Sequence, residues 1–267
     1  MIDTKKKIER EDAIVTSMNE IGIGMMDVWI QSKHIAQLAK PGQFVSLYCN
    51  DSSRLLPRPI SICEIDKKKN EVRLVFRVVG KGTLELAKVK AGDRVRIMGP
   101  LGNGFSVERV PAIIIGGGVG IPPLLELSKQ LKADNITDEV KIILGYRDSQ
   151  LFLQSEFEAY GEVFVATEDG SAGIKGNVMN IVENLKLNND LIYACGPKPM
   201  LKAIKDFAQK NQIKAQISME EKMACGIGAC LVCVCKSTNQ DDHSNVHNKR
   251  VCKDGPVFYS DEIEIDC

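Results

Sequence analysis

The 267-residue sequence predicts a small antiparallel β-barrel, then an α/β domain built on a parallel sheet, then a short cysteine-rich domain. Three observations support this fold class. Short strand-like segments fill the first part of the chain, apolar runs alternate with helical patterns in the second, and most of the cysteines gather in the third. The predicted domains are therefore 1–108, 109–215 and 216–267.

The first region shows strand character with little helix between the strands. Turn signals such as Lys40-Pro41-Gly42 and Gly80-Lys81-Gly82 separate the segments. Short strands at this spacing are typical of a small closed antiparallel barrel. The expected strands are 13–17, 27–31, 43–48, 60–65, 72–79 and 94–98, with one short helix over 82–89.

The second region has a different hydrophobic pattern. Strand-like apolar runs alternate there with segments that have leucines at helical spacing. This alternation predicts a parallel sheet with helices on both of its faces. The expected strands are 112–115, 140–146, 162–167 and 191–194. The expected helices are 122–132, 179–185 and 200–209.

Composition excludes some classes of function. The chain has 35 basic and 35 acidic residues, and a protein that binds nucleic acid generally needs a basic excess. The lysines of Met1–Lys7 are followed by no apolar segment, so we expect no signal peptide. The longest apolar runs are too short to span a bilayer. We therefore expect a cytoplasmic protein without a nucleic-acid or membrane partner.

A glycine-rich turn follows the strand expected over 112–115. The turn, Gly116-Gly117-Gly118-Val119-Gly120, leads through Ile121-Pro122-Pro123 into an expected helix. Glycines let a backbone approach a pyrophosphate closely, and a helix start offers N–H groups and the positive end of its dipole. The surrounding strand and helix favour a dinucleotide site, although the spacing is not G-x-G-x-x-G. The candidate cofactor-binding residues are Gly116, Gly117, Gly118 and Gly120.

A second turn, Cys195-Gly196-Pro197, ends the last expected strand. Ligands bind at the carboxyl edge of open α/β sheets, so Gly196 and Pro197 are candidate cofactor-binding residues. Cys195 is the candidate catalytic residue, placed beside the nicotinamide. A plain strand-to-helix turn is the alternative. The segment 168–171 ends another strand, where a carboxylate either accepts hydrogen bonds from ribose hydroxyls or caps a turn.

The cysteines of the third region have a spacing with chemical meaning. Cys225, Cys230, Cys233 and Cys252 match C-x4-C-x2-C…C, the spacing of plant-type [2Fe–2S] sites. Small residues between the first two let backbone N–H groups point at the sulfurs. A structural zinc site is the alternative, but zinc sites usually pair cysteines in two C-x2-C knuckles. These four cysteines are the candidate metal ligands.

Other cysteines and histidines have plainer expected roles. Cys49, Cys63 and Cys235 are expected to be packing residues, because free cysteines often behave as small buried hydrophobes. His243 and His247 lie in a polar stretch, and we expect both to be exposed to solvent.

The sequence resembles the ferredoxin reductase superfamily. Arg58-Pro59-Ile60-Ser61 resembles its flavin motif R-x-[YFI]-[ST], and the two glycine turns resemble its nicotinamide-domain turns. The domain order resembles, more narrowly, the electron-transfer subunits of type B, NAD-dependent dihydroorotate dehydrogenases. Segments 75–83, 223–230 and 251–258 are especially similar, and the similarity covers essentially the whole chain. The long loop 237–249 is a departure.

The resemblance implies cofactors and a partner. NADH would deliver hydride to FAD, and a [2Fe–2S] cluster would relay electrons to the FMN of a separate catalytic subunit. That subunit would oxidise dihydroorotate to orotate in pyrimidine (UMP) biosynthesis, in a heterotetramer of two catalytic and two electron-transfer subunits. The FAD-binding residues implied by the resemblance are Arg58, Pro59, Ile60, Ser61, Val75, Phe76, Arg77, Gly82 and Thr83.

Residue chemistry supports the same relay, because a two-electron hydride donor and a one-electron cluster need a flavin between them. We therefore expect an oxidoreductase subunit. One alternative is an NAD(P)H-dependent reductase subunit that serves a ferredoxin or a sulfur-compound partner. Another is a binding module with structural zinc and a regulatory nucleotide. NADH is preferred over NADPH, and Arg147 is the candidate for contacting a 2′-phosphate.

Overall fold

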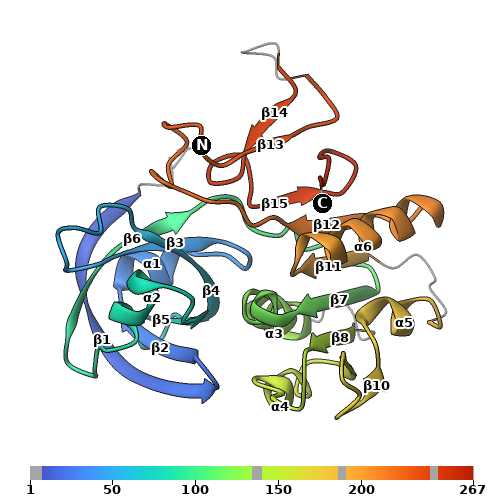
Figure 1. Ribbon diagram of the computed structural model, residues 1–267, viewed down its shortest axis with the longest axis horizontal. Helices are drawn as coiled ribbons and strands as arrows, with labels where there is room; N and C mark the ends of the chain where they lie inside the picture. Colours follow the sequence, from blue (N-terminus) through green and yellow to red (C-terminus); the bar gives the residue numbers. More distant parts are fainter. Residues whose placement is uncertain (1–7, 134–139, 186–190, 241–245, 267) are drawn as a thin grey trace.

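The structure is a computed structural model that describes residues 8–133, 140–185, 191–240 and 246–266. Figure 1 shows the barrel on one side, the α/β sheet on the other, and the cysteine-rich segment above both. None of the helices in these ranges is both long and apolar enough to cross a membrane.

The N-terminal part is a closed antiparallel barrel, as predicted. Its strand order is β1-β2-β5-β4-β3-β6, and apolar side chains such as Val15, Leu47 and Leu74 fill its interior. The strands are β1 (Glu9–Gly22), β2 (Met25–Gln31), β3 (Phe44–Tyr48), β4 (Arg58–Asp66), β5 (Glu71–Arg77) and β6 (Arg94–Leu101).

Two short helices accompany the barrel. The expected helix is present as α2 (Lys81–Leu86). A second helix, α1 (Lys33–Leu38), was not expected. It begins at Ser32, whose hydroxyl accepts a hydrogen bond from the backbone N–H of Ile35 at 3.2 Å. A serine in this capping position satisfies an N–H group that the first helical turn leaves without a partner.

The α/β part contains a seven-stranded sheet of order β10-β9-β8-β7-β11-β12-β15. Its strands run parallel except for β15, which is antiparallel to β12. The strands are β7 (Ala112–Gly117), β8 (Val140–Tyr146), β9 (Glu162–Thr167), β10 (Ile174–Lys175), β11 (Leu191–Cys195), β12 (Ala215–Ser218) and β15 (Val257–Tyr259). The helices are α3 (Leu125–Ala133), α4 (Gln154–Phe157), α5 (Val178–Val182) and α6 (Lys198–Lys210).

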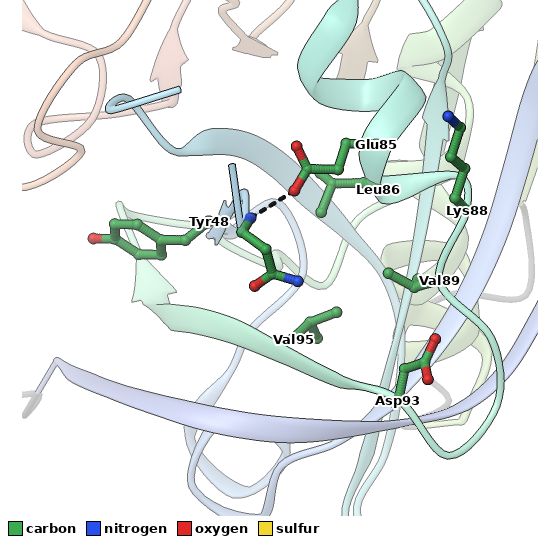
Figure 2. A pocket seen from close by; sticks show the side chains of 8 residues that line it. Tyr48, Glu85, Leu86, Lys88, Val89, Asp93 and Val95 are labelled. Carbon is green, nitrogen blue, oxygen red and sulfur yellow. Dashed lines mark hydrogen bonds between the residues drawn. The ribbon is translucent and has the colours of Figure 1, made fainter. Parts of the chain in front are cut away.

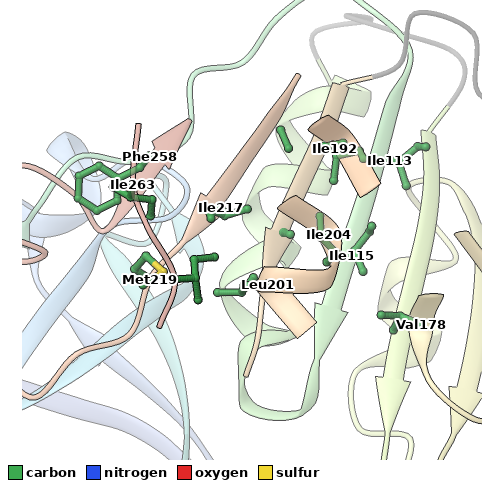
Figure 3. Close-up of a cluster of buried hydrophobic side chains, with 14 of the residues drawn as sticks. Ile113, Ile115, Val178, Ile192, Leu201, Ile204, Ile217, Met219, Phe258 and Ile263 are labelled. Carbon is green, nitrogen blue, oxygen red and sulfur yellow. The ribbon is translucent and has the colours of Figure 1, made fainter. Parts of the chain in front are cut away.

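Helices cover both faces of the sheet, as the sequence predicts. Ile113 and Ile115 of β7 pack in one buried cluster with side chains of α5 and α6, among them Leu201 (Figure 3). Ile114 points the other way, into a second cluster that contains Leu127 of α3. Because successive side chains of a strand face opposite sides, a strand buried on both sides reads as a continuous apolar run.

The C-terminal segment shares its core with the sheet. The predicted domain boundary between residues 215 and 216 falls inside β12, which pairs with β15. Phe258 and Ile263 lie in the same cluster as Ile217 and Met219 (Figure 3). The α/β part therefore supplies a core for the C-terminal segment.

A small hairpin carries the end of the cysteine-rich segment. It consists of β13 (Val234–Lys236) and β14 (Asn248–Arg250), so the loop expected over 237–249 ends in a strand. Residues 241–245, with His243, lie outside the described residues. His247 is exposed, as expected.

Candidate functional site

The two glycine turns meet at the centre of the sheet edge. β7 and β11 are neighbours, β8 to β10 continue on one side, and β12 lies on the other. The register pairs Gly116 with Cys195, so both strands end at the same level. The reversal of strand order at this point makes it the switch point where open α/β sheets bind ligands.

Close backbone contact explains why glycine occupies the first turn. A Cβ on Gly120 would lie 2.4 Å from the carbonyl oxygen of Cys195 and 2.5 Å from the nitrogen of Gly196. A Cβ on Gly117 would lie 2.6 Å from the sulfur of Met200. Gly118 differs, because it has a φ of +53° and faces open space. The turn therefore offers bare backbone to a ligand on its outer side.

Cys195 lies half-buried at the end of β11. Burial raises the pKa of its thiol to about 12, although a hydrogen bond with Ser218 acts in the opposite direction. The raised pKa favours the protonated thiol at neutral pH, and a thiol is a weaker nucleophile than a thiolate. A neutral, polarisable group at this position can pack against a ring and help to orient it.

The flavin motif residues lie together on the barrel. Arg58 to Ser61 form the first half of β4 and are half-buried. A Cβ on Gly82 would lie 2.1 Å from Nε of Arg58, so the guanidinium rests directly on the start of α2. Thr83 holds this turn closed, because its Oγ1 accepts from the backbone N–H groups of Val79 at 3.0 Å and Gly80 at 3.1 Å.

The residues Val75 to Arg77 lie on β5, the neighbour of β4 in the barrel. The side chains of Val75 and Phe76 are buried in two different apolar clusters. Contacts from these two residues to a ligand would therefore come from the backbone, whereas the side chain of Arg77 is exposed.

A hollow that the sequence did not reveal opens beside α2. Its volume is about 320 Å³, and Tyr48, Leu86 and Val95 are among the residues that line it (Figure 2). On its rim, Glu85 accepts a hydrogen bond from the backbone N–H of Asn50 at 2.6 Å. No sequence pattern could have indicated the hollow, because its walls come from three separate segments.

The four predicted metal ligands form two pairs. The thiols of Cys225 and Cys230 lie within hydrogen-bonding reach of each other, and so do those of Cys233 and Cys252. The backbone N–H of Ala229 donates to Sγ of Cys225 at 3.3 Å, and that of Cys252 donates to Sγ of Cys233 at 3.4 Å. Amide donors of this kind stabilise thiolate sulfur.

The loop favours a thiolate at its first cysteine. Burial acts to raise the pKa of Cys225, but hydrogen bonds from the backbone of Ile227, from Cys230 and from Ala229 lower it to about 6. Gly226 and Gly228 have φ values of +69° and +84°, a region that glycine adopts without strain. The positive φ values turn the loop tightly enough to place these N–H groups around the sulfur.

The donor set fits two metal ions better than one. Within the described ranges no three His, Cys, Asp or Glu side chains converge as a mononuclear zinc site requires. Two adjacent pairs of thiols suit a [2Fe–2S] cluster, in which four cysteines hold two irons. Cys235 is buried on β13 and packs in the core, as expected.

The cysteine loop rests on the barrel. A Cβ on Gly226 would lie 3.0 Å from Oγ of Ser46 on β3 and 3.5 Å from Leu101 on β6. Ser46 is paired with Pro59 of β4 across the barrel ladder. One β-strand therefore separates the cysteine loop from the strand that carries the flavin motif.

The remaining candidates lie farther along the sheet edge. Asp169 follows β9, and its carboxylate accepts hydrogen bonds from the backbone N–H of Ser171 at 2.9 Å and from the hydroxyl at 2.6 Å. These bonds are those of a turn cap, and the other expected alternative, a contact to ribose hydroxyls, stays a prediction. Arg147 follows β8 and is exposed.

Two sequence families match parts of the chain. One is described as the iron-sulfur cluster binding domain of dihydroorotate dehydrogenase B and matches residues 220–264. The other is described as the oxidoreductase NAD-binding domain and matches residues 114–206. The first span contains the paired cysteines, and the second contains both turns at the switch point.

Individual proteins are similar over almost the whole chain. The electron transfer subunit of dihydroorotate dehydrogenase B (NAD(+)) from Geobacillus thermodenitrificans (strain NG80-2) is 40% identical over 262 residues, which cover 96% of this chain and 99% of that protein. The subunit of the same name from Fusobacterium nucleatum subsp. nucleatum is 40% identical over 266 residues, with the same coverage.

Solved structures show the same architecture. The NADH-dependent reduced ferredoxin-NADP oxidoreductase, from a study of flavin-based electron bifurcation, superposes with a TM-score of 0.85 at 30% identity, covering 95% of this chain and 90% of that chain. A flavohemoglobin from Malassezia yamatoensis with bound FAD and heme has a TM-score of 0.66 at 19% identity, covering 76% of this chain and 57% of that chain. The second likeness concerns the fold alone.

Proposed function

The chain belongs to the family of dihydroorotate dehydrogenase B electron transfer subunits, and we propose on that premise that it carries electrons between NAD(H) and the catalytic subunit of such an enzyme. The proposed route joins NAD(H) to FMN in the catalytic subunit through FAD and a [2Fe–2S] cluster. It would serve pyrimidine (UMP) biosynthesis in the cytoplasm. The observation that carries the proposal is the arrangement of two thiol pairs one strand away from the flavin motif.

Each proposed site uses groups that suit its cofactor. The guanidinium of Arg58 would pair with the FAD pyrophosphate, and Ser61 on the same strand would face the flavin ring. The turn at Gly116 to Gly120, with Gly196 and Pro197, would hold NAD(H), and Cys195 would pack beside the nicotinamide. Bound flavin would exchange electrons in pairs with the nicotinamide and singly with the cluster. The cluster ligands would be Cys225, Cys230, Cys233 and Cys252.

Electron balance sets the net direction of the relay. Oxidation of dihydroorotate to orotate releases two electrons and two protons, and NAD⁺ accepts both electrons with one proton as NADH. With dihydroorotate as donor, electrons run from the catalytic subunit towards NAD⁺. The same relay can be driven backwards by NADH, which makes NADH a convenient reductant for testing it.

The tip of the cysteine loop is the proposed site of electron exchange with the catalytic subunit. Cys230 is exposed, and its neighbours Ile227, Leu231 and Val232 are 47%, 63% and 54% exposed. Apolar side chains gathered around an exposed redox ligand suit a protein interface. We propose a heterotetramer in which two copies of this chain bind two catalytic subunits.

The test is a visible spectrum of the assembled complex. The chain is co-expressed with a dihydroorotate dehydrogenase catalytic subunit from the same organism, purified without oxygen, and mixed with NADH or with dihydroorotate. Bleaching of flavin and cluster absorbance by each donor is expected. A complex that dihydroorotate does not bleach, although NADH does, would contradict the assignment of the partner.

The likeness to the reduced ferredoxin-NADP oxidoreductase favours a second candidate, a reductase subunit with a ferredoxin partner. Its test uses the same anaerobic preparation. Reduction of an added ferredoxin by NADH, without any response to dihydroorotate, would select this candidate over the first.

A further inference from the structure

A buried arginine lies where the barrel meets the α/β part. Arg73 is on β5, and only 7% of its surface is exposed. Its Nε and Nη2 donate to the two carboxylate oxygens of Asp27, each at 2.9 Å. Its Nη1 and Nη2 also donate to the two oxygens of Glu156, at 2.5 and 3.0 Å. One guanidinium therefore makes two bidentate contacts, which fix its orientation.

These contacts cross between the two parts of the chain. Asp27 belongs to β2 of the barrel, whereas Glu156 belongs to α4 of the α/β part. A second bridge runs beside the first, because Nζ of Lys129 on α3 donates to Glu64 on β4 at 2.8 Å. Glu64 also pairs with Arg73 at 3.4 Å, so the two bridges share one carboxylate.

A third contact completes the set of interactions. The carboxylate of Glu126 on α3 accepts a hydrogen bond from the backbone N–H of Ile65 on β4, at 2.9 Å. The interdomain clamp is defined here as Arg73, Asp27, Glu64, Lys129, Glu126 and Glu156. Its members come from three barrel strands and two helices of the α/β part.

The clamp stands next to both proposed cofactor sites. Val75 lies two residues beyond Arg73 on β5, on the same side of the strand, and belongs to the strand segment predicted to contact flavin. Its side chain packs in one buried cluster with Ile121 and Leu124, which directly follow the dinucleotide turn. The flavin strand and the dinucleotide turn are in contact, and the clamp residues Arg73 and Glu126 lie on the same strand and on the helix that follows the turn.

Apolar packing and the clamp contribute differently to this junction. Apolar burial favours contact but is non-directional, so it tolerates small sliding movements. Bidentate hydrogen bonds to two carboxylates hold only in one relative orientation. Hydride transfer needs reacting atoms about 3–3.5 Å apart. Small sliding movements between the two parts would change that distance and lower the rate.

We propose that the interdomain clamp is a positioning device, which holds the α/β part at the orientation that brings the nicotinamide to the flavin. The inference rests on the proposed function. Arg73, Lys129 and Glu156 are positioning residues, because they act through the placement of the cofactor sites and touch no reacting atom. Buried ion pairs often contribute little net stability, which makes a role in orientation the physically stronger explanation of the clamp.

The decisive variant is Glu156→Gln, with Glu158→Gln as its matched control. Glu156 has a side chain that is 41% exposed, so the protein should fold normally without its charge. Glu158 lies two residues away and accepts a hydrogen bond from Gln154 at 3.0 Å, a contact within its own helical segment. Lys129→Met tests the second bridge independently.

Two measurements separate positioning from simple structural support. Stopped-flow reduction of the holoenzyme flavin by NADH gives the hydride-transfer rate and the apparent Kd for NADH. Hydrogen exchange of the backbone amide of Ile65, measured in the same preparations, reports whether the junction opens. We expect Glu156→Gln to lower the rate about tenfold with little change in Kd, since a displacement near 1 Å costs up to about 10²-fold. Faster exchange at Ile65 is expected as well. In Glu158→Gln, the hydride-transfer rate and the exchange at Ile65 should both stay at their wild-type values.

The outcomes distinguish this inference from the proposed function. A wild-type protein whose flavin NADH does not reduce would contradict the proposed function itself. A wild-type protein that is reduced normally, together with Glu156→Gln and Lys129→Met proteins of unchanged rate, would overturn the clamp. A change in Kd alone, with the rate at saturation unchanged, would also overturn it.

Discussion

Substitution of Gly120 by alanine tests the contact between the two turns at the switch point. Its Cβ would lie 2.4 Å from the carbonyl oxygen of Cys195 and 2.5 Å from both the carbonyl carbon of that residue and the nitrogen of Gly196. All three are backbone atoms, so no flexible side chain can move aside. The two turns must separate instead.

The size of the separation follows from the distances. Opening the contact from 2.4 Å to the 3.4 Å of an ordinary van der Waals contact moves the turns apart by about 1 Å. A misplacement of about 1 Å can cost about 10²-fold in rate, which corresponds to about 2.7 kcal/mol in activation free energy. Overpacking of the backbone should also lower the free energy of unfolding by about 1–3 kcal/mol.

The assay is stopped-flow reduction of the bound flavin by NADH without oxygen. The cluster spectrum and a urea unfolding curve are measured on the same protein, to report an intact cluster and the free energy of unfolding. Gly24→Ala serves as a control for loss of stability, because Gly24 has a positive φ of +67°, which strains alanine, but has open space around it. Gly24→Ala should therefore lower the free energy of unfolding and keep the wild-type rate. If folded Gly120→Ala protein reduces its flavin at the wild-type rate, the dinucleotide site does not lie at this junction.

Three further predictions follow from the sites. Cys230→Ser should abolish the visible absorbance of the cluster while Cys235→Ser keeps it, and an intact spectrum in the first variant would remove Cys230 from the ligand set. Cys195→Ala should slow flavin reduction by NADH and leave the cluster spectrum unchanged, so an unchanged rate would refute its place beside the nicotinamide. Burial raises the pKa of Glu126, which means that its ionisation in the folded state costs stability as pH rises through that pKa. Glu126→Gln should therefore be more stable than the wild type in urea at pH 7, with the difference vanishing below the ordinary carboxyl pKa of 4.5, and a difference independent of pH would contradict this reasoning.

Local patterns were sufficient to predict most of the barrel and the sheet. The six barrel strands are bounded by turn residues, and the central strands of the α/β part are apolar on both faces, so each carries its own signal. The elements that were missed are short. β12 and β15 have 4 and 3 residues, and both depend on pairing within the sheet, β12 with β11 and β15, and β15 with β12.

The same distinction holds for the candidate sites. The cysteine spacing and the glycine turn are local patterns whose chemistry can be inferred from a few consecutive residues. The clamp around Arg73 is not local, because its hydrogen-bond partners Asp27 and Glu156 are 46 and 83 residues away in the sequence. A single arginine in a strand gives no sign of which carboxylates surround it, so only the folded chain could reveal this group.

The cysteine-rich segment joins the two larger parts, and this explains how a relay can work without large movements. Asn103, just after β6 of the barrel, donates from its side-chain amide to the backbone carbonyls of Lys253 and Asp254, each at 3.1 Å. Beyond these residues the chain enters β15, which pairs with β12 of the sheet. The segment that follows Cys252 is therefore held by the barrel at one end and by the sheet at the other. These contacts hold the chain beside Cys252 against both larger parts, so a relay through the proposed cluster site would not require that site to move.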